Sequence, residues 1–128
     1  TFASVVGAGL PPAAAADSHD FLPYLKQQTA TGPRDTIVHN TRKDDYAIRH
    51  GRWLLIDGKT GNARPVPKAW MEKHKTPPDD GSPVELFDMK EDPGQRKNLA
   101  AEHPERVAEM QALLHDIRTR GHSAPRLE

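Results

Sequence analysis

The segment ELFDMKEDPGQRKNLAAEHP (residues 85–104) joins a strand, a tight turn and the start of a helix without a gap. Alternation over residues 84–89 predicts a short strand. It places Val84 and Leu86 on one side of the strand, and Phe87 and Met89 on the other. Asp92-Pro93-Gly94 predicts a sharp turn, because proline presets φ and glycine follows it. We therefore interpret the segment as structural.

Residues 104–120 predict an amphipathic helix. His103 stands at its entrance, Pro104 fits the first helical position, and Gly121 suits the residue after its end. Apolar side chains recur at intervals of three and four and form one stripe, namely Val107, Met110, Leu114 and Ile117, with Leu113 beside it. A helix with one apolar stripe must pack against something, and the nearest apolar surface is a sheet.

Three further strands are predicted over residues 36–41, 45–49 and 52–57, which are rich in β-branched and aromatic residues. A two-residue turn at His50-Gly51 would pair Arg49 with Arg52 at a solvated hairpin end. That pairing sets Ile48 opposite Trp53 and gives one shared face of four side chains, Tyr46, Ile48, Trp53 and Leu55. The predicted fold class is α+β, a small antiparallel sheet of about four strands with the C-terminal helix packed on it.

Residues 1–35 are interpreted as a helical remnant and connector from a preceding domain, and residues 36–128 as a C-terminal subdomain. The chain opens without Met on an apolar helical pattern that Gly7 and Gly9 can end. We expect the apolar side chains of this part to be exposed, disordered or buried in a self-association contact: Phe2, Val5, Val6, Leu22 and Leu25. A processed or tagged free-standing domain is the alternative.

Residues 58–83 form a long insert that is poor in pattern and rich in Lys, Pro, Gly and Asp. Connections longer than about 12 to 15 residues are uncommon in compact domains unless they are functional or mobile. Within the insert, residues 69–73 predict one helical turn, with Trp70 and Met71 as an anchor.

Composition narrows the classes of partner. Lys plus Arg (18) balances Asp plus Glu (18), and the pI is about 7.0, so we expect no nucleic-acid partner. No apolar run approaches the roughly 20 residues that span a bilayer, so no membrane partner is expected. Hydrophobic residues make up only 35% of the chain, and it contains 12 Pro and 9 Gly, which predicts a small core.

Catalytic and metal-binding patterns are not found in the sequence. The seven histidines include no pair at i, i+4 with an acidic partner, as a zinc protease requires. The serines lie in no Gly-x-Ser-x-Gly elbow, and there is no Cys. The sequence therefore predicts no catalytic residue and no metal ligand.

The order of the motifs resembles the C-terminal region of type I sulfatases, the arylsulfatase family. The similarity rests on RHGRWLLI (residues 49–56), then a variable insert, then VELFDMKEDPGQRKNLAAEHP (residues 84–104) and an amphipathic helix. Residues 1–10 and 17–26 also resemble the family's preceding helix and turn. Leu54, Phe87 and Gln95 stand where that family commonly has Lys, Tyr and Glu.

The resemblance implies an alkaline-phosphatase-like parent enzyme that hydrolyses sulfate esters with a formylglycine and a bound calcium ion. Formylglycine forms from the first residue of a Cys/Ser-x-Pro-x-Arg motif, and Ser123-Ala124-Pro125-Arg126 places Arg one residue too early. Asp79-Asp80 resembles the family's metal-binding pair only superficially, because it follows Pro77-Pro78 rather than a buried strand. This span alone is thus expected to be inactive, and its expected partner is the missing N-terminal catalytic domain.

The same resemblance suggests one weak site. In the family the C-terminal sheet approaches the mouth of the substrate cleft, so His39, Asn40 and Arg42 are candidates for the substrate rim; a solvated strand end is the alternative. Export to the periplasm or secretion is the family's common location. A free-standing protein-interaction module with an exposed apolar face is the competing interpretation of the chain.

Overall fold

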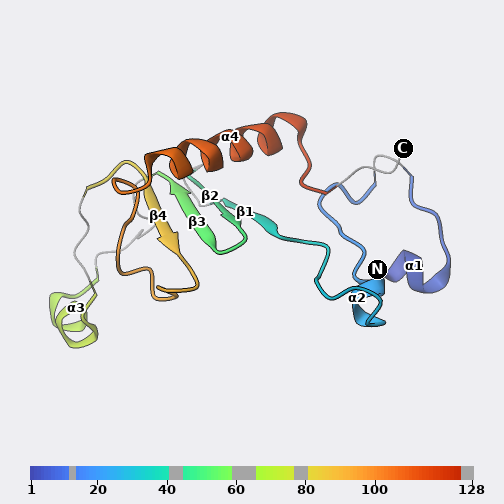
Figure 1. Cartoon of the computed structure of the whole chain (residues 1–128), viewed down its shortest axis with the longest axis horizontal. Helices are drawn as coiled ribbons and strands as arrows, with labels where there is room; N and C mark the ends of the chain where they lie inside the picture. Colours follow the sequence, from blue (N-terminus) through green and yellow to red (C-terminus); the bar gives the residue numbers. More distant parts are fainter. Residues whose placement is uncertain (12–13, 41–44, 59–65, 77–80, 125–128) are drawn as a thin grey trace.

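The computed structural model describes residues 1–11, 14–40, 45–58, 66–76 and 81–124. Its described part contains one four-stranded antiparallel sheet and a long C-terminal helix, with three short helices elsewhere (Figure 1). The sheet order is β1-β2-β3-β4, from strands at Thr36–Asn40, Tyr46–His50, Trp53–Asp57 and Glu85–Asp88. The long helix is α4, Pro104–Arg120. The α+β prediction is thereby confirmed.

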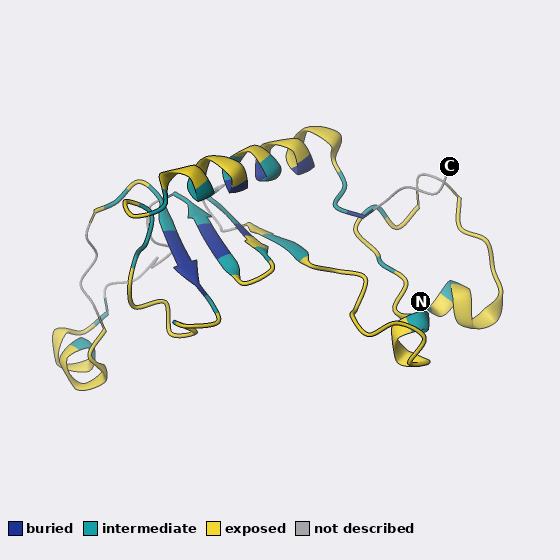
Figure 2. Ribbon diagram, in the orientation of Figure 1, coloured by how far each residue is buried: buried dark blue, intermediate teal, exposed yellow. Residues whose placement is uncertain are grey.

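Helix α4 lies across one face of the sheet, contacts β2 and β3, and turns its apolar stripe toward them (Figures 1 and 2). One core cluster joins the two layers: Ile48, Leu55, Leu86, Met110, Leu114 and Ile117. Each of these side chains is buried, because a four-stranded sheet with one apolar face needs a second layer to exclude water. The predicted stripe of α4 is confirmed.

The ends of α4 follow the sequence signals. His103 is the residue before the helix, Pro104 occupies its first turn, and Gly121 ends it with φ of 73°. That backbone conformation favours glycine, which has no Cβ to clash with the preceding carbonyl. The side-chain amide of Gln111 donates a hydrogen bond of 2.8 Å to Asp57 Oδ1 and so fastens α4 to the end of β3.

The predicted hairpin register is wrong by two residues. Ile48 pairs with Leu55 rather than with Trp53, and His50 pairs with Trp53, so Gly51 and Arg52 form the turn. Gly51 has φ of 56°, which glycine adopts readily at the first position of such a turn. A shift of two leaves every side chain on its predicted face, because side chains alternate with a period of two.

The Asp92-Pro93-Gly94 turn forms, with the Gln95 N–H donating to the Asp92 carbonyl at 3.1 Å. The positive φ of the turn belongs to Gln95 (52°) and not to Gly94. Asp92 Oδ2 accepts hydrogen bonds from the Arg96 and Lys97 backbone N–H groups at 2.6 and 2.9 Å. The Asp92 carboxylate therefore stabilises the residues that follow the turn.

The remaining helices are short and contain no buried residue. They are α1 (Phe2–Val6), α2 (Leu22–Leu25) and α3 (Lys68–His74). Figure 1 shows α1 and α2 beyond one end of the sheet and α3 beyond the other. No helix of the described residues is both long and apolar enough to cross a membrane.

Candidate functional site

The predicted substrate-rim residues lie at the end of β1, an edge strand. His39 and Asn40 are exposed and pair in the sheet with Ala47 and Tyr46. Their side chains make no hydrogen bond or ion pair with another described residue. Arg42 lies outside the described residues. His39 and Asn40 are neighbours at the end of β1, and their side chains project to opposite faces of the sheet. Their role at a substrate rim stays a prediction.

A metal-binding or catalytic cluster is not visible in the part of the chain that the structure describes. No three His, Asp or Glu side chains converge there as metal ligands. Asp79 and Asp80 lie outside that part. The chain has no Cys, one of the two residue types from which a formylglycine forms.

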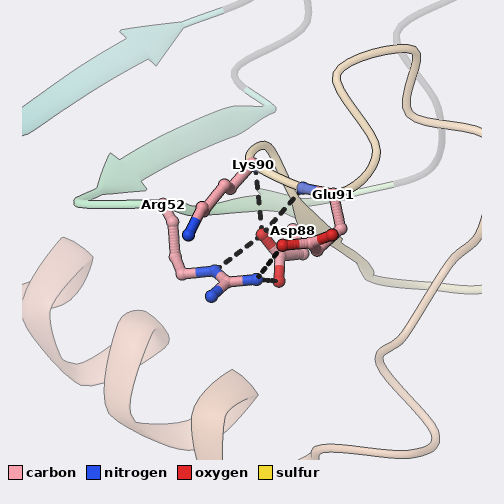
Figure 3. Close-up of polar contacts among 4 residues, drawn as sticks. All are labelled: Arg52, Asp88, Lys90 and Glu91. Carbon is pink, nitrogen blue, oxygen red and sulfur yellow. Dashed lines mark hydrogen bonds and ion pairs between the residues drawn. The ribbon is translucent and has the colours of Figure 1, made fainter.

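The best-defined polar cluster joins the turn before β3 to the end of β4 (Figure 3). The Arg52 guanidinium donates to both carboxylate oxygens of Asp88, with 2.7 Å between Arg52 Nε and Asp88 Oδ1. Asp88 Oδ1 also accepts the backbone N–H groups of Lys90 and Glu91, at 3.0 and 3.4 Å. Asp88 is buried, whereas Arg52 is half-exposed.

These contacts hold Asp88 in its charged form. The Arg52 hydrogen bonds lower the pKa of the Asp88 carboxyl, burial opposes them, and the two backbone N–H groups lower it further. The same pair raises the pKa of the Arg52 guanidinium. A carboxylate so fully occupied by donors has a structural role, and it fixes the turn that follows β4.

Trp53 connects this cluster to the start of α4. Its ring meets the His103 ring edge to face, with centroids 5.5 Å apart, and Arg52 and Arg106 lie 5.9 and 5.8 Å from its centroid. Arg52 was expected to be a solvated hairpin-end arginine opposite Arg49, and that expectation is wrong. Local sequence patterns carry no signal for its pairing, because Asp88 lies 36 residues further along the chain.

Asn98 was not singled out from the sequence, although it lies in the quoted segment. Its Oδ1 accepts the Leu86 and Ala100 backbone N–H groups, both at 3.0 Å, and its Nδ2 donates to the Val84 carbonyl at 3.3 Å. The Leu99 N–H donates to the Leu86 carbonyl at 2.8 Å. Residues 98–99 thereby form hydrogen bonds with backbone groups on the open edge of β4. An edge strand without such partners offers its backbone groups to other chains.

Exposed apolar side chains gather on α1 and α2. Phe2 is 89% exposed, and three other apolar side chains are also exposed, Val5, Val6 and Leu25. Leu22 is half-buried. The expectation of exposure is therefore met by four of the five side chains. Exposed apolar side chains that gather in one place are typical of interaction surfaces.

The two short helices are fastened to each other and to the end of α4 by polar contacts. The Phe21 N–H donates to Thr1 Oγ1 at 2.8 Å, and Ser4 Oγ donates to the Asp20 carboxylate at 2.8 Å. Beyond α4, both the N–H and the hydroxyl of Ser123 donate to Asp17 Oδ1 at 2.8 Å. These donors lower the pKa of the Asp17 carboxyl.

Comparison with known proteins gives a consistent family. A curated N-acetylgalactosamine-6-O-sulfatase of Bacteroides thetaiotaomicron is 31% identical over 120 residues, which are 94% of this chain and 22% of that protein. A solved sulfatase from a glycosaminoglycan-metabolising locus of the same organism superimposes with a TM-score of 0.67 at 29% identity, over 92% of this chain and 23% of that one. A 2-O GAG sulfatase shares the fold, with a TM-score of 0.63 at 24% identity, over 94% and 23%.

No family model matches the chain. The chain spans about a fifth of the length of the curated relative that it resembles. The part of that relative with no counterpart here is therefore much larger than the part that is matched.

Proposed function

Because this chain corresponds to the C-terminal region of sulfatases in sequence and fold, we propose that it is the structural subdomain completing an enzyme that hydrolyses sulfate esters. One observation carries the proposal: the likeness extends over 94% of this chain but only 22% of the relative. A complete match on one side and a small fraction on the other is the relation of a subdomain to its enzyme.

The subdomain contributes no reacting group in this proposal. Calcium and formylglycine belong to the larger part of the enzyme, because this chain has no Cys and no correctly spaced Ser-x-Pro-x-Arg motif. A formylglycine hydrate supplies a nucleophile there, and a divalent cation stabilises charge on the sulfate oxygens. The chain's own contribution is to support the cleft and to shape its mouth.

The substrate class is a sulfated carbohydrate. The two relatives named for a position, 6-O and 2-O, both act on sugar sulfates by their names. His39, Asn40 and Arg42 then contact the sugar beyond the ester, where imidazole, amide and guanidinium groups can hydrogen-bond hydroxyl or carboxylate groups.

The catalytic domain covers the apolar surface of α1 and α2. Phe2, Val5, Val6 and Leu25 supply the buried side of that interface, and each apolar side chain withdrawn from water contributes about 1.5–3 kcal/mol. Without the catalytic domain, the same surface leads the 128 residues to self-associate.

Sulfate release tests the function. We expect the full-length protein to release sulfate from 6-O-sulfated N-acetylgalactosamine, and residues 1–128 alone to release none above a no-protein control. Turnover by the 128 residues, or none by the full-length protein on a panel of sugar and aryl sulfates, would contradict the proposal. Replacing His39 and Asn40 by Ala should raise KM for a sulfated oligosaccharide and leave aryl sulfate turnover unchanged.

The alternative interpretation, a free-standing interaction module, also accounts for the exposed apolar surface. The module interpretation does not explain the similarity to sulfatases over almost the whole chain. The encoding reading frame separates the two, because a Cys/Ser-x-Pro-x-Arg motif upstream of residue 1 belongs to the enzyme alone.

A further inference from the structure

Helix α3 places the largest side chain of the long insert in water. Trp70 is 48% exposed, and α3 contains no buried residue. Figure 1 shows α3 projecting beyond the sheet, and Figure 2 shows its surface as mainly exposed. The sequence predicted Trp70 as an anchor for this helix, and its exposure contradicts that prediction. An exposed Trp that anchors nothing in the described chain is available for a ligand.

The indole ring is nevertheless held in place. His74 lies four residues after Trp70, one helical turn away, and the two ring centroids are 4.3 Å apart with an interplanar angle of 31°. This tilted ring contact restricts the Trp70 side chain before any ligand arrives. A pre-organised aromatic surface loses less conformational entropy on binding than a mobile one.

Lysines are frequent in the sequence around Trp70. Lys68, Lys73 and Lys75 flank it within the sequence KAWMEKHK (residues 68–75), against the single acidic residue Glu72. Lys73 lies three residues after Trp70 and so shares its side of the helix. None of the three lysines forms an ion pair with any residue that the structure describes. The segment thus combines an exposed aromatic side chain with three nearby lysines in the sequence that pair with no described acidic residue.

We propose that Trp70, with Lys68, Lys73 and Lys75, binds a sulfated carbohydrate through the sugar residues beyond the one that loses its sulfate. The C–H face of a sugar ring carries partial positive charge and packs against the negative face of an indole. Each sulfate group is a compact anion that a lysine ammonium contacts as a point charge. The inference rests on the proposed function for the nature of the carbohydrate.

Affinity measured by calorimetry on the full-length protein tests the site. The probe is a chondroitin sulfate hexasaccharide, and its desulfated form is the matched ligand. We expect Trp70→Ala to weaken binding of the sulfated probe about tenfold, and Trp70→Phe to keep most of the affinity. Replacing the three lysines by Ala should weaken binding and flatten its salt dependence, whereas Lys26→Ala on the distant, exposed end of α2 should change nothing.

Turnover measured on the same variants separates this inference from the proposed function. Trp70→Ala should raise KM for the hexasaccharide and leave kcat/KM for a sulfated monosaccharide unchanged. If the protein releases no sulfate but Trp70→Ala weakens its affinity for the probe, the site is supported and the proposed function fails. If it is a sulfatase whose affinity for the probe is unchanged in Trp70→Ala, the inference is overturned. A lowered Tm with unchanged affinity would also overturn it, by making Trp70 a packing residue.

Discussion

Asp88 shows how one carboxylate can organise a junction between distant parts of the chain. It binds the side chain of Arg52 and two backbone N–H groups at once, in a buried position at the end of β4. An unpaired buried carboxylate would be strongly disfavoured, so the pair with Arg52 permits the burial. The protonation of Asp88 is therefore linked to the stability of the β3–β4 pairing.

Acidification should destabilise this junction. The pKa of Asp88 in the folded protein lies below its unfolded value of about 3.9. Its contribution is therefore fully present above that value and is lost as pH falls through the folded pKa. We expect the urea midpoint to fall below about pH 3.9, and to fall less steeply in Asp88→Asn. Glu91→Gln is the control, because Glu91 is exposed and 3.5 Å from Arg52; an equal flattening there would contradict the assignment.

Asn98 has a comparable role at the open edge of β4. Asn98→Ala removes the acceptor of the Leu86 N–H in a partly buried setting, and an unsatisfied donor there costs about 1–3 kcal/mol. We expect the free energy of unfolding to fall by that amount, measured by urea titration. Hydrogen exchange of the Leu86 amide should accelerate in the variant. An unchanged exchange rate would show that residues 98–99 do not protect the strand edge.

The strands illustrate why a face can be predicted when a register cannot. Alternation fixes which side chains share a face, and Tyr46, Ile48, Trp53 and Leu55 do lie on the side covered by α4. The pairing of Ile48 with Leu55 depends instead on where the turn falls. His50-Gly51 and Gly51-Arg52 both offer a glycine to the turn, and the structure uses the second.

The packing of α4 on the sheet predicts a large effect of core truncation. Leu114 is almost fully buried between the helix and the strands, so Leu114→Ala should lower the free energy of unfolding by about 2–5 kcal/mol. Chemical denaturation measures the change. Ala112→Ser, on the exposed face of the same helix, should stay within about 0.5 kcal/mol. Similar losses from both variants would contradict the observed orientation of α4.

The burial of apolar side chains differs between the two parts of the chain. The sheet and α4 share a core, whereas α1 and α2 bury no side chain and are held by polar contacts to one another and to Ser123. A segment with so little apolar burial opens locally at a lower free energy than the core does. This distribution agrees with a subdomain whose first helices belong to an interface.

Charges placed on the exposed apolar surface of α1 and α2 should destabilise the full-length protein. Val5→Asp combined with Leu25→Asp removes two exposed apolar side chains of the proposed interface. We expect the full-length protein to lose about 1.5–3 kcal/mol of stability for each residue, because neither can then be buried without its charge. Thermal unfolding checks this, with Ser18→Asp on the exposed connector as the matched control. Equal melting temperatures for the unmodified protein, the double variant and Ser18→Asp would contradict an interface at Val5 and Leu25.

The local patterns of the chain were sufficient for its elements and their buried faces. The intervals of Val107, Met110, Leu114 and Ile117 predicted the helix and its stripe, and Pro104 and Gly121 predicted its ends. These features depend on residues within a few positions of one another, which is the range over which helix and strand periodicity acts. The order of the motifs likewise predicted the likeness to sulfatases in sequence and fold.

Contacts between distant residues were decided by the folded arrangement. The Arg52–Asp88 pair, the cover of β4 by Asn98 and the exposure of Trp70 each depend on where a turn or a long connection places a side chain. Alternation and composition carry no information about such pairings, because many partners of the right type exist along the chain. Only packing in three dimensions, which must pair most buried polar groups together, selects one of them.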